Sequence, residues 1–266
     1  MKTRVSISID RDILGRLDKE IDNVAVFSRS EAIEKIIEKH VSEKKKAVIL
    51  AGGPPENLFV KEANTYRPLL KIKGKPLISD IIEKLKKAGY TDIIIIGSKE
   101  VLSEIYKHIG ESGISYIEEK EHLGTAKTLQ LALEKIKNTF LFVPCDHYFD
   151  LDLREMELYH KKNQALLTLV VYSGTKHAWD KSSIVELEGN KIKSYVEHPK
   201  KKNSFLTSLL IGFAEPEIFS FIPKTKLTYS LQVDVFPEIA KKNSLVGYLF
   251  SGEWNNVHSI NDVKEI

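Results

Sequence analysis

Three pairs of residues that could bind a charged ligand each follow a short apolar run in the sequence. The pairs are Gly52-Gly53, Glu118-Glu119 and Asp146-His147. Glycines let the backbone approach a ligand closely and present its amides. Carboxylates accept hydrogen bonds from N–H donors, and an aspartate can hold Mg²⁺ against phosphates. Chemistry is therefore expected where these three apolar runs end.

Strands and helices that alternate along residues 46–266 must position these pairs. The segments are AVILAGG, a helix from Pro76 to Ala88, TDIIIIGS, a second helix, ISYIEE, a helix from Thr125 to Lys137, and TFLFVPCDH. Short apolar strands separated by amphipathic helices predict an α/β fold with a mainly parallel sheet and helices on both faces. Ligands bind such sheets beyond the carboxyl ends of the strands, which is where the three pairs occur.

Five motifs in this part of the chain follow the order of a known family. They are AVILAGG with RPLLKIKGKPL, LGTA at Leu123–Ala126, FVPCDHYFDLDL around Asp146, VEHP at Val196–Pro199, and GEWNNVHSINDV near the C-terminus. Together they resemble sugar-1-phosphate nucleotidyltransferases, which join a nucleoside triphosphate to a sugar phosphate and release pyrophosphate. The resemblance covers residues 46–266 and implies a Rossmann-like nucleotidyltransferase domain, because five ordered motifs are far more specific than one glycine pair.

The resemblance implies a role for each matching residue. The nucleotide would contact Ala51, Gly52, Gly53, Glu119, Gly124 and Thr125, the sugar phosphate would contact Glu197 and His198, and the catalytic residues would be Arg67 and Asp146. Asp146 would also hold Mg²⁺, and Glu119 would accept from the N1 and N2 donors of guanine. Two plainer interpretations stay open: Glu119 as a solvated loop charge, and Asp146 as a helix or turn cap.

Several catalytic positions depart from the pattern of this family. In the phosphate loop Pro55, Glu56 and Asn57 stand in place of glycine, threonine and arginine, while Arg67 and His198 replace lysines and Asn256 replaces a second metal-binding aspartate. Proline removes an amide donor, glutamate adds negative charge beside a triphosphate, and a lost arginine or carboxylate removes electrostatic stabilisation. These changes argue against efficient pyrophosphate-releasing catalysis and leave slow chemistry open.

A different pattern occupies residues 1–45. Residues 4–10 alternate between polar and apolar side chains and predict a half-buried strand. Asp10 fits an N-cap for a helix that reaches Ile21, and Ser28 with Glu31 forms a capping box for a second helix. A lone strand with two open edges needs a partner, so we expect a second copy to supply it.

This N-terminal segment resembles the ribbon-helix-helix family of dimeric DNA-binding proteins, in which two such strands pair and enter the major groove. The resemblance implies that double-stranded DNA is contacted at its base edges by Arg4, Ser6 and Ser8, and at a phosphate by Ser28, Arg29 and Ser30. It also implies a homodimer or a higher oligomer. The alternative is a dimerisation arm whose serine and arginine side chains form a solvated face.

Composition narrows the class of protein. Of the 266 residues, 42% are hydrophobic and 29% are charged, which is typical of folded globular proteins and excludes global disorder. The net charge of +3 gives no overall electrostatic case for nucleic acid, so any such case is local. A single cysteine, Cys145, cannot form an internal disulfide, which favours the cytoplasm. No apolar run approaches the roughly 20 residues that span a bilayer, so no membrane partner is expected.

These patterns predict a two-domain protein, with a ribbon-helix-helix domain at residues 1–45 and a nucleotidyltransferase-like domain at residues 46–266. The predicted function is that of a DNA-binding transcriptional regulator whose larger domain senses a nucleotide, sugar phosphate or nucleotide sugar. An alternative is an active sugar-1-phosphate nucleotidyltransferase, for example a guanylyltransferase, with an added DNA-binding module. A third interpretation makes the larger domain an inert dimerisation platform.

Overall fold

The computed structural model describes residues 5–22, 26–42, 44–174, 179–201 and 204–266. The chain forms two compact units, Met1–Lys44 and Lys45–Ile266. Lys45 belongs to the second unit because it already pairs with Tyr90 in the sheet of that unit.

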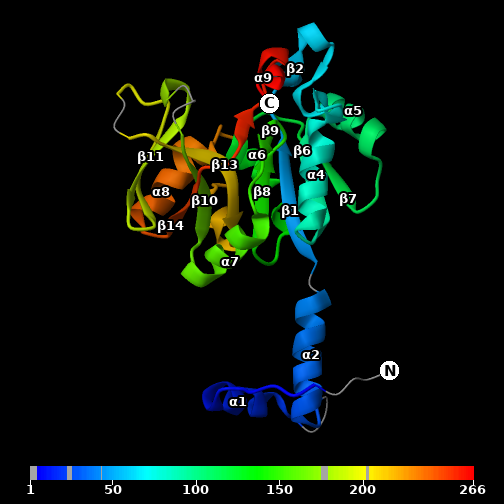
Figure 1. Cartoon of the computed structure of the whole chain (residues 1–266), viewed down its shortest axis with the longest axis vertical. Helices are drawn as coiled ribbons and strands as arrows, with labels where there is room; N and C mark the ends of the chain where they lie inside the picture. Colours follow the sequence, from blue (N-terminus) through cyan, green and yellow to red (C-terminus); the bar gives the residue numbers. More distant parts are fainter. Residues whose placement is uncertain (1–4, 23–25, 43, 175–178, 202–203) are drawn as a thin grey trace. The chain divides into compact units, whose positions relative to one another are not determined.

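A nine-stranded mixed sheet forms the centre of the second unit (Figure 1). Its strands, in spatial order, are β10 (Leu167–Ser173), β14 (Leu245–Phe250), β12 (Lys191–Glu197), β11 (Ser183–Glu188), β13 (Leu206–Ala214), β8 (Phe140–Pro144), β1 (Lys45–Ala51), β6 (Tyr90–Gly97) and β7 (Ile114–Glu118). Strands β8, β1, β6 and β7 run parallel to one another. Strand β13, in contrast, is antiparallel to β8, β10 and β11, and β12 is antiparallel to β11 and β14.

The expected α/β class is therefore confirmed, whereas the expectation of a mainly parallel sheet is wrong for the half that begins at β13. The reason lies partly in the two-residue turn at Gly189-Asn190, which joins β11 directly to β12. Strands joined by so short a turn can pair only in the antiparallel sense, because a parallel connection needs a crossover of a dozen residues or more.

Helices cover both faces of the sheet, as the sequence predicts. One buried core contains side chains of α4 (Leu77–Lys87), α5 (Lys99–Ile109) and α7 (Leu153–Asn163), and the other contains those of α6 (Thr125–Gln130) and α8 (Phe236–Lys241). The central strand β1 contributes to both. Ala47 and Ile49 lie in the first core and Val48 and Leu50 in the second, because successive side chains of a strand point to opposite faces.

The helix expected from Thr125 to Lys137 ends earlier, at Gln130, and a 3₁₀ turn follows over Leu133–Lys135. In this stretch backbone N–H groups donate to carbonyls three residues earlier, as Lys135 does to Ala132 at 2.9 Å. Such winding is tighter than that of an α-helix. It leaves both Ala132 and Ile136 buried in the core.

The remaining α-helices and strands of the second unit are short. They are α3 (Pro55–Leu58), β2 (Phe59–Val60), β3 (Thr65–Tyr66), β4 (Lys71–Ile72), β5 (Lys75–Pro76), β9 (His147–Phe149), β15 (Trp254–Asn256) and α9 (Ile260–Lys264). Strand β9 pairs with β15, so that Asn256 lies opposite His147. The backbone N–H of Val257 also donates to the carbonyl of Asp146 at 2.8 Å. This pairing brings the C-terminal motif of the sequence beside Asp146.

The first unit begins with α1 (Arg11–Leu17). Asp10 caps this helix as expected, since its carboxylate accepts from the backbone N–H of Asp12 at 2.8 Å. The predicted extension to Ile21 does not form as an α-helix. Instead the chain tightens into a 3₁₀ turn over Asp18–Glu20.

The second helix of this unit is α2 (Arg29–Ser42). Its predicted capping box forms in part. Ser28 accepts from the backbone N–H of Glu31 at 3.2 Å, but the Glu31 carboxylate reaches one residue further back and accepts from Phe27 at 2.8 Å. The helix start is therefore fixed by the residues that the sequence indicates.

The strand expected over residues 4–10 is not formed in the portion that the structure describes, residues 5–10. Its expected partner is the strand of a second copy, and a single chain cannot supply those hydrogen bonds. The apolar side chains nearby are accordingly open to solvent, with Val5 76% and Phe27 63% exposed. Among the described side chains of this unit Leu17 and Ala32 are the buried apolar ones, which is a small core.

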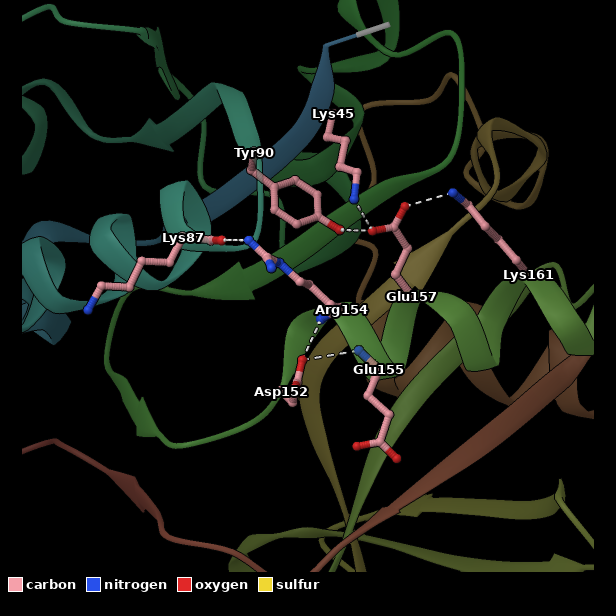
Figure 2. A network of polar contacts seen from close by, with 8 residues as sticks. All are labelled: Lys45, Lys87, Tyr90, Asp152, Arg154, Glu155, Glu157 and Lys161. Atoms are coloured by element: carbon pink, nitrogen blue, oxygen red, sulfur yellow. Dashed lines mark hydrogen bonds and ion pairs between the residues drawn. The ribbon is translucent and has the colours of Figure 1, made fainter. Parts of the chain in front are cut away.

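A buried carboxylate anchors the first residue of the second unit. Figure 2 shows Lys45 of β1 and Lys161 of α7 pointing to the carboxylate of Glu157, at 2.6 and 2.8 Å. The hydroxyl of Tyr90 donates to the same carboxylate at 3.4 Å. Burial raises the pKa of Glu157, but the hydrogen bonds and charges of Lys161 and Lys45 together outweigh it and lower the pKa.

Replacing this carboxylate should destabilise the second unit. We expect Glu157→Gln to lower the free energy of unfolding at pH 7 by about 2 kcal/mol, because hydrogen bonds to charged groups contribute roughly 1.5–3 kcal/mol. Urea unfolding followed by circular dichroism measures the change. The control is Glu134→Gln, which changes an exposed glutamate in the same way and should leave stability unaltered. Equal stability of the two variants would contradict the anchoring role.

A buried histidine joins α7 to the sheet. His160 stacks on Phe213, its Nδ1 lies 2.8 Å from the hydroxyl of Thr168, and its Nε2 lies 3.1 Å from the carboxylate of Glu215. A neutral ring satisfies both contacts, since Nε2–H donates to Glu215 while Nδ1 accepts from Thr168. Burial lowers the pKa of His160, and the hydrogen bond that the ring donates to Glu215 opposes this only in part.

Acid should therefore weaken the folded state through His160. Because the folded pKa lies below the unfolded value of about 6.5, the unfolded chain binds more protons between these values, and stability falls as pH drops below about 6.5. We expect urea midpoints measured at pH 7 and pH 5 to differ less for His160→Gln than for the unaltered protein. The exposed His108, changed to Gln, should keep the original difference. An unchanged slope in His160→Gln would refute this role.

Candidate functional site

A cavity of about 440 Å³ lies where β1 and β8 end. Six of the residues to which the sequence resemblance assigns a role line it, namely Gly52, Gly53, Arg67, Gly124, Thr125 and Asp146. Its size is that of small-molecule sites, which are concave and contain a few convergent polar groups. Chain segments far apart in the sequence thus meet at the carboxyl edge of the parallel strands.

Glu119 is buried directly beside this cavity, with 3% of its surface exposed, so it is not a solvated loop charge. Its carboxylate accepts from the backbone N–H of Gly53 at 2.5 Å and from the hydroxyl of Thr128. His122 Nδ1 lies 3.1 Å from the same carboxylate. A Cβ on Gly52 would lie 2.7 Å from Glu119 Oε2, so the turn requires glycine there. Glu119 thereby ties the glycine turn to α6.

Arg67 and Asp146 form an ion pair in the cavity. Arg67 begins a 3₁₀ turn over Arg67–Leu69, and its Nη1 lies 3.1 Å from Asp146 Oδ2. His258 Nε2 lies 3.7 Å from the same oxygen. Burial lowers the pKa of His258, and the positive charge of Arg67 lowers it further. The arrangement places one carboxylate and one permanent cation side by side, which suits a ligand with several phosphate oxygens.

Apart from Asp146 itself, this part of the site offers few side-chain ligands for a metal ion. His147 is buried, its pKa falls to about 4 because of burial, and its Nδ1 lies 3.4 Å from Trp254 Nε1, which donates to it. Among the residues described by the structure, no group of three or more His, Cys, Asp and Glu side chains could hold a metal. Asp146 fits a Mg²⁺ ion that takes its other ligands from phosphates and water.

The LGTA loop is fastened to the segment before α8. Gly124 has φ +92°, and the backbone N–H of Tyr229 donates to the carbonyl of Leu123 at 2.7 Å, while the Tyr229 carbonyl accepts from Ala126 at 3.1 Å. The hydroxyl of Thr125 donates to Gln232 at 2.8 Å and accepts from the backbone of Leu231 at 2.9 Å. The loop that borders the cavity is therefore held on both sides.

The family model for "Nucleotidyl transferase" matches residues 46–266. The chain belongs to the nucleotidyltransferase family. It is similar to the mannose-1-phosphate guanyltransferase of Yarrowia lipolytica, at 29% identity over 80% of this chain and 60% of that protein. It is also similar to the bifunctional protein GlmU of Methanocaldococcus jannaschii, at 27% identity over 82% of this chain and 52% of that protein. The chain thus spans about half to three-fifths of the length of these relatives.

Solved structures share the fold of this nucleotidyltransferase domain. A putative glucose-1-phosphate thymidylyltransferase from Bacillus anthracis, in complex with a sucrose, superposes with a TM-score of 0.74 at 22% identity. The match covers 83% of this chain and 93% of that one. An apo UDP-glucose pyrophosphorylase superposes with a TM-score of 0.68 at 20% identity, covering 84% of this chain and 96% of that one. At these identities the likeness extends to the fold.

Other predicted site residues are not among those that line the cavity of the nucleotidyltransferase domain. Ala51 is the buried last residue of β1. Glu197 ends β12 and accepts from the hydroxyl of Ser183. His198 follows with φ +47°, its Nε2 3.5 Å from the Glu197 carboxylate. Neither Glu197 nor His198 is among the residues that line the cavity.

The residues predicted to contact DNA are only partly described. Arg4 lies outside the described residues, while Ser6, Ser8 and Ser30 are exposed. The guanidinium of Arg29 forms two hydrogen bonds with Asp18, at 2.6 and 2.8 Å, so it would have to exchange this partner for a phosphate. In the described part of the chain no helix is long and apolar enough to cross a bilayer.

Two residues at the site were not anticipated from the sequence, His122 and His258. His122 directly precedes LGTA and lines the cavity, and His258 follows Asn256 by two positions and approaches Asp146. His258 stands inside a recognised motif and His122 directly before one, so motif position was a usable signal. The partner of His258, Asp146, is distant in sequence, whereas that of His122 is the nearby Glu119, whose burial only the folded chain shows.

Proposed function

We propose that the nucleotidyltransferase domain binds a nucleoside triphosphate and a sugar 1-phosphate and joins them with release of pyrophosphate. The main support is the cavity that holds Arg67, Asp146 and the Gly52-Gly53 turn together. The names of the relatives favour this enzymatic alternative, at the level of the family, over the regulator predicted from the sequence. The mannose-1-phosphate guanyltransferase relatives make a guanine nucleotide the first candidate.

In the proposed reaction an oxygen of the sugar phosphate attacks the α-phosphorus, and the bond from that phosphorus to the bridging oxygen of pyrophosphate breaks. Mg²⁺ bound by Asp146 would neutralise phosphate charge. The guanidinium of Arg67 would hold non-bridging oxygens and stabilise the charge that develops on them. The Gly52-Gly53 turn, which carries no side chains, would allow the phosphates to approach the backbone closely.

The altered phosphate loop limits the expected rate. Pro55 stands at the first turn of α3, and Glu56 and Asn57 are exposed beside it. None of these side chains supplies a positive charge, and Asn256 leaves Asp146 without a second carboxylate. We therefore expect turnover below that of ordinary enzymes, whose rates are about 1 to 10³ per second.

Pyrophosphate release tests this proposal. The full chain is incubated with Mg²⁺, each of several nucleoside triphosphates and each of several sugar 1-phosphates, and pyrophosphate is measured by a coupled assay. Release that needs both substrates supports the transfer reaction. Nucleotide binding without release from any pair would instead favour a sensor. Absence of any thermal shift with all candidate ligands would favour an inert platform, because a ligand of the folded state must raise the melting temperature.

A second candidate function is DNA binding by residues 1–45, with the nucleotidyltransferase domain as the sensor of a transcriptional regulator. The exposed apolar side chains of the first unit favour it, because a second copy that paired with residues 4–10 would cover such a surface. The protein would then be a homodimer or a higher oligomer on double-stranded DNA. A cytoplasmic location, suggested by the single buried cysteine, is part of this proposal.

Substitution of Arg4 tests base recognition. DNA fragments enriched by the protein from a random pool are compared with random DNA in a mobility-shift assay. We expect Arg4→Ala to weaken binding to the enriched fragments much more than binding to random DNA, because base contacts carry specificity. Arg16→Ala, which removes another exposed positive charge from this unit, should weaken both about equally. Equal loss in Arg4→Ala would exclude it as a base contact.

A further inference from the structure

Glu119 and His122 form a pair beside the cavity. The contacts of the two side chains indicate separate roles that the sequence does not predict. We infer that His122 contacts the nucleobase of the bound nucleotide and that the buried Glu119 acts as a positioning residue that orients it. This inference rests on the proposed nucleotide binding and assigns the base contact to a different side chain from the one expected.

Both oxygens of the Glu119 carboxylate already face hydrogen-bond donors of the protein. Its Oε2 accepts from the backbone N–H of Gly53 and faces His122, and its Oε1 accepts from the hydroxyl of Thr128. Only 2% of the side chain is exposed. A nucleobase could reach this carboxylate only by displacing one of these donors, and an abandoned buried donor costs about 1–3 kcal/mol. Glu119 is thus a poor direct acceptor for a ligand.

The same contacts fix the tautomer of the neutral His122 ring. Because an ionised carboxylate only accepts, Nδ1 of His122 must carry the hydrogen that points to Glu119. The hydrogen bond at one ring nitrogen sets the state of the other, so in the neutral ring Nε2 presents a lone pair. Within the described part of the chain no hydrogen bond to Nε2 is formed. This nitrogen is available as an acceptor.

His122 is also well placed to use that acceptor. It lines the cavity together with Gly124 and Thr228, and 30% of its side chain is exposed. The chain on each side of His122 is held by hydrogen bonds. The N–H of Glu119 donates to the carbonyl of Gly97 at 2.8 Å, and the carbonyl of Leu123 accepts from the N–H of Tyr229. An acceptor that the protein already holds in place at the wall of the cavity loses little conformational freedom when a ligand binds.

The matching ligand chemistry is a base edge that donates. Imino and exocyclic amino groups, such as N1–H and N2–H of guanine, would donate to Nε2 of His122. A triphosphate chain offers acceptors only and would gain nothing from this nitrogen while the ring is neutral. The base and the phosphates therefore depend on different side chains, and this difference can be measured.

The experiment compares two ligands on the full-length protein by isothermal titration calorimetry with Mg²⁺. One ligand is the tightest-binding of the four ribonucleoside triphosphates, and the other is inorganic tripolyphosphate, which lacks a base. We expect His122→Ala to bind the nucleotide roughly 3- to 10-fold more weakly, the range of one neutral hydrogen bond, with tripolyphosphate affinity unchanged. His122→Gln, whose amide oxygen can accept, should recover most of the nucleotide affinity. His108→Ala, the same change at an exposed position, is the control.

The outcomes separate this inference from the proposed function. Nucleotide binding that is unchanged in His122→Ala would overturn the base contact and leave the proposed function standing. An equal loss of both ligands would also overturn it, since His122 would then act through the glycine turn. If the unaltered protein binds neither ligand, the proposed function fails and this inference fails with it.

Glu119→Gln tests the positioning role separately. A glutamine cannot accept from all three donors, so we expect it to weaken tripolyphosphate as well as nucleotide, because Gly53 loses its anchor. A loss confined to the nucleotide would show that Glu119 itself contacts the base. Should this variant fail to fold, the His122 variants decide the question alone.

Discussion

Asp146→Asn is expected to reduce the rate of pyrophosphate release by about 10²- to 10³-fold, the effect of losing one electrostatic stabiliser at a reacting centre. Asparagine has nearly the same shape and keeps an oxygen that can accept from Arg67, so the fold should persist. The negative charge is lost, however, and with it the attraction for Mg²⁺ at the phosphates. Initial rates at saturating nucleotide and sugar 1-phosphate, with circular dichroism as a check of folding, measure the effect.

The matched control for this prediction is Asp150→Asn. Asp150 is an exposed aspartate four positions further along the chain, and it is not among the residues that line the cavity. We expect it to retain the activity of the unaltered protein to within a factor of about two, since surface substitutions usually change little. Comparable rates for the two variants would show that Asp146 does not take part in the reaction.

Gly124→Ala is expected to destabilise the nucleotidyltransferase domain by about 3 kcal/mol and to abolish nucleotide binding at micromolar concentrations. Gly124 adopts φ +92° and ψ 163°, a conformation open essentially to glycine alone. An added Cβ would lie 2.6 Å from the carbonyl oxygen of Tyr229. That oxygen cannot retreat without loss of the hydrogen bonds that join Tyr229 to Leu123 and Ala126.

Gly74→Ala is the control that distinguishes backbone strain from the steric clash with Tyr229. Gly74 also has a positive φ, +83°, but an added Cβ there would meet no atom within 4 Å. We expect it to cost about 1 kcal/mol, the strain alone, and to leave nucleotide affinity unaltered. Thermal melts and calorimetric titration of both variants provide the measurements. If the two variants were equally stable, the close approach of Tyr229 would be irrelevant to the fold.

The parallel half of the sheet was predictable because its signals are local. Ile93–Ile96 form an apolar run of strand length, and the helical spacing that follows Pro76 matches α4 closely. The half from β13 to β10, in which β10 and β14 are parallel and the other pairs are antiparallel, was not predictable, because the position of β13 between β11 and β8 depends on contacts between strands distant in sequence. A parallel pattern inferred from the first half does not extend to strands joined by tight turns.

The site shows the same division between local and distant information. Motif order is enough to select Gly52, Arg67 and Asp146, all of which line the cavity. The burial of Glu119 could not be predicted, since one of its donors, Gly53, lies 66 positions away. An acidic stretch of sequence is as compatible with an exposed loop as with a buried position. The prediction of a strand near the N-terminus fails for a related reason, because the expected partner of that strand belongs to another molecule.

The central position of β1 has a consequence during synthesis on the ribosome. Lys46 lies opposite Asp92 in one neighbouring strand and Phe140 in the other. At roughly 5–20 residues per second, a ribosome needs about 5–20 s to pass from the first to the last of these positions. Throughout that interval β1 is an apolar strand with at least one open edge, a template for pairing with other chains. The nascent chain, rather than the finished protein, is thus the form of this molecule most exposed to aggregation.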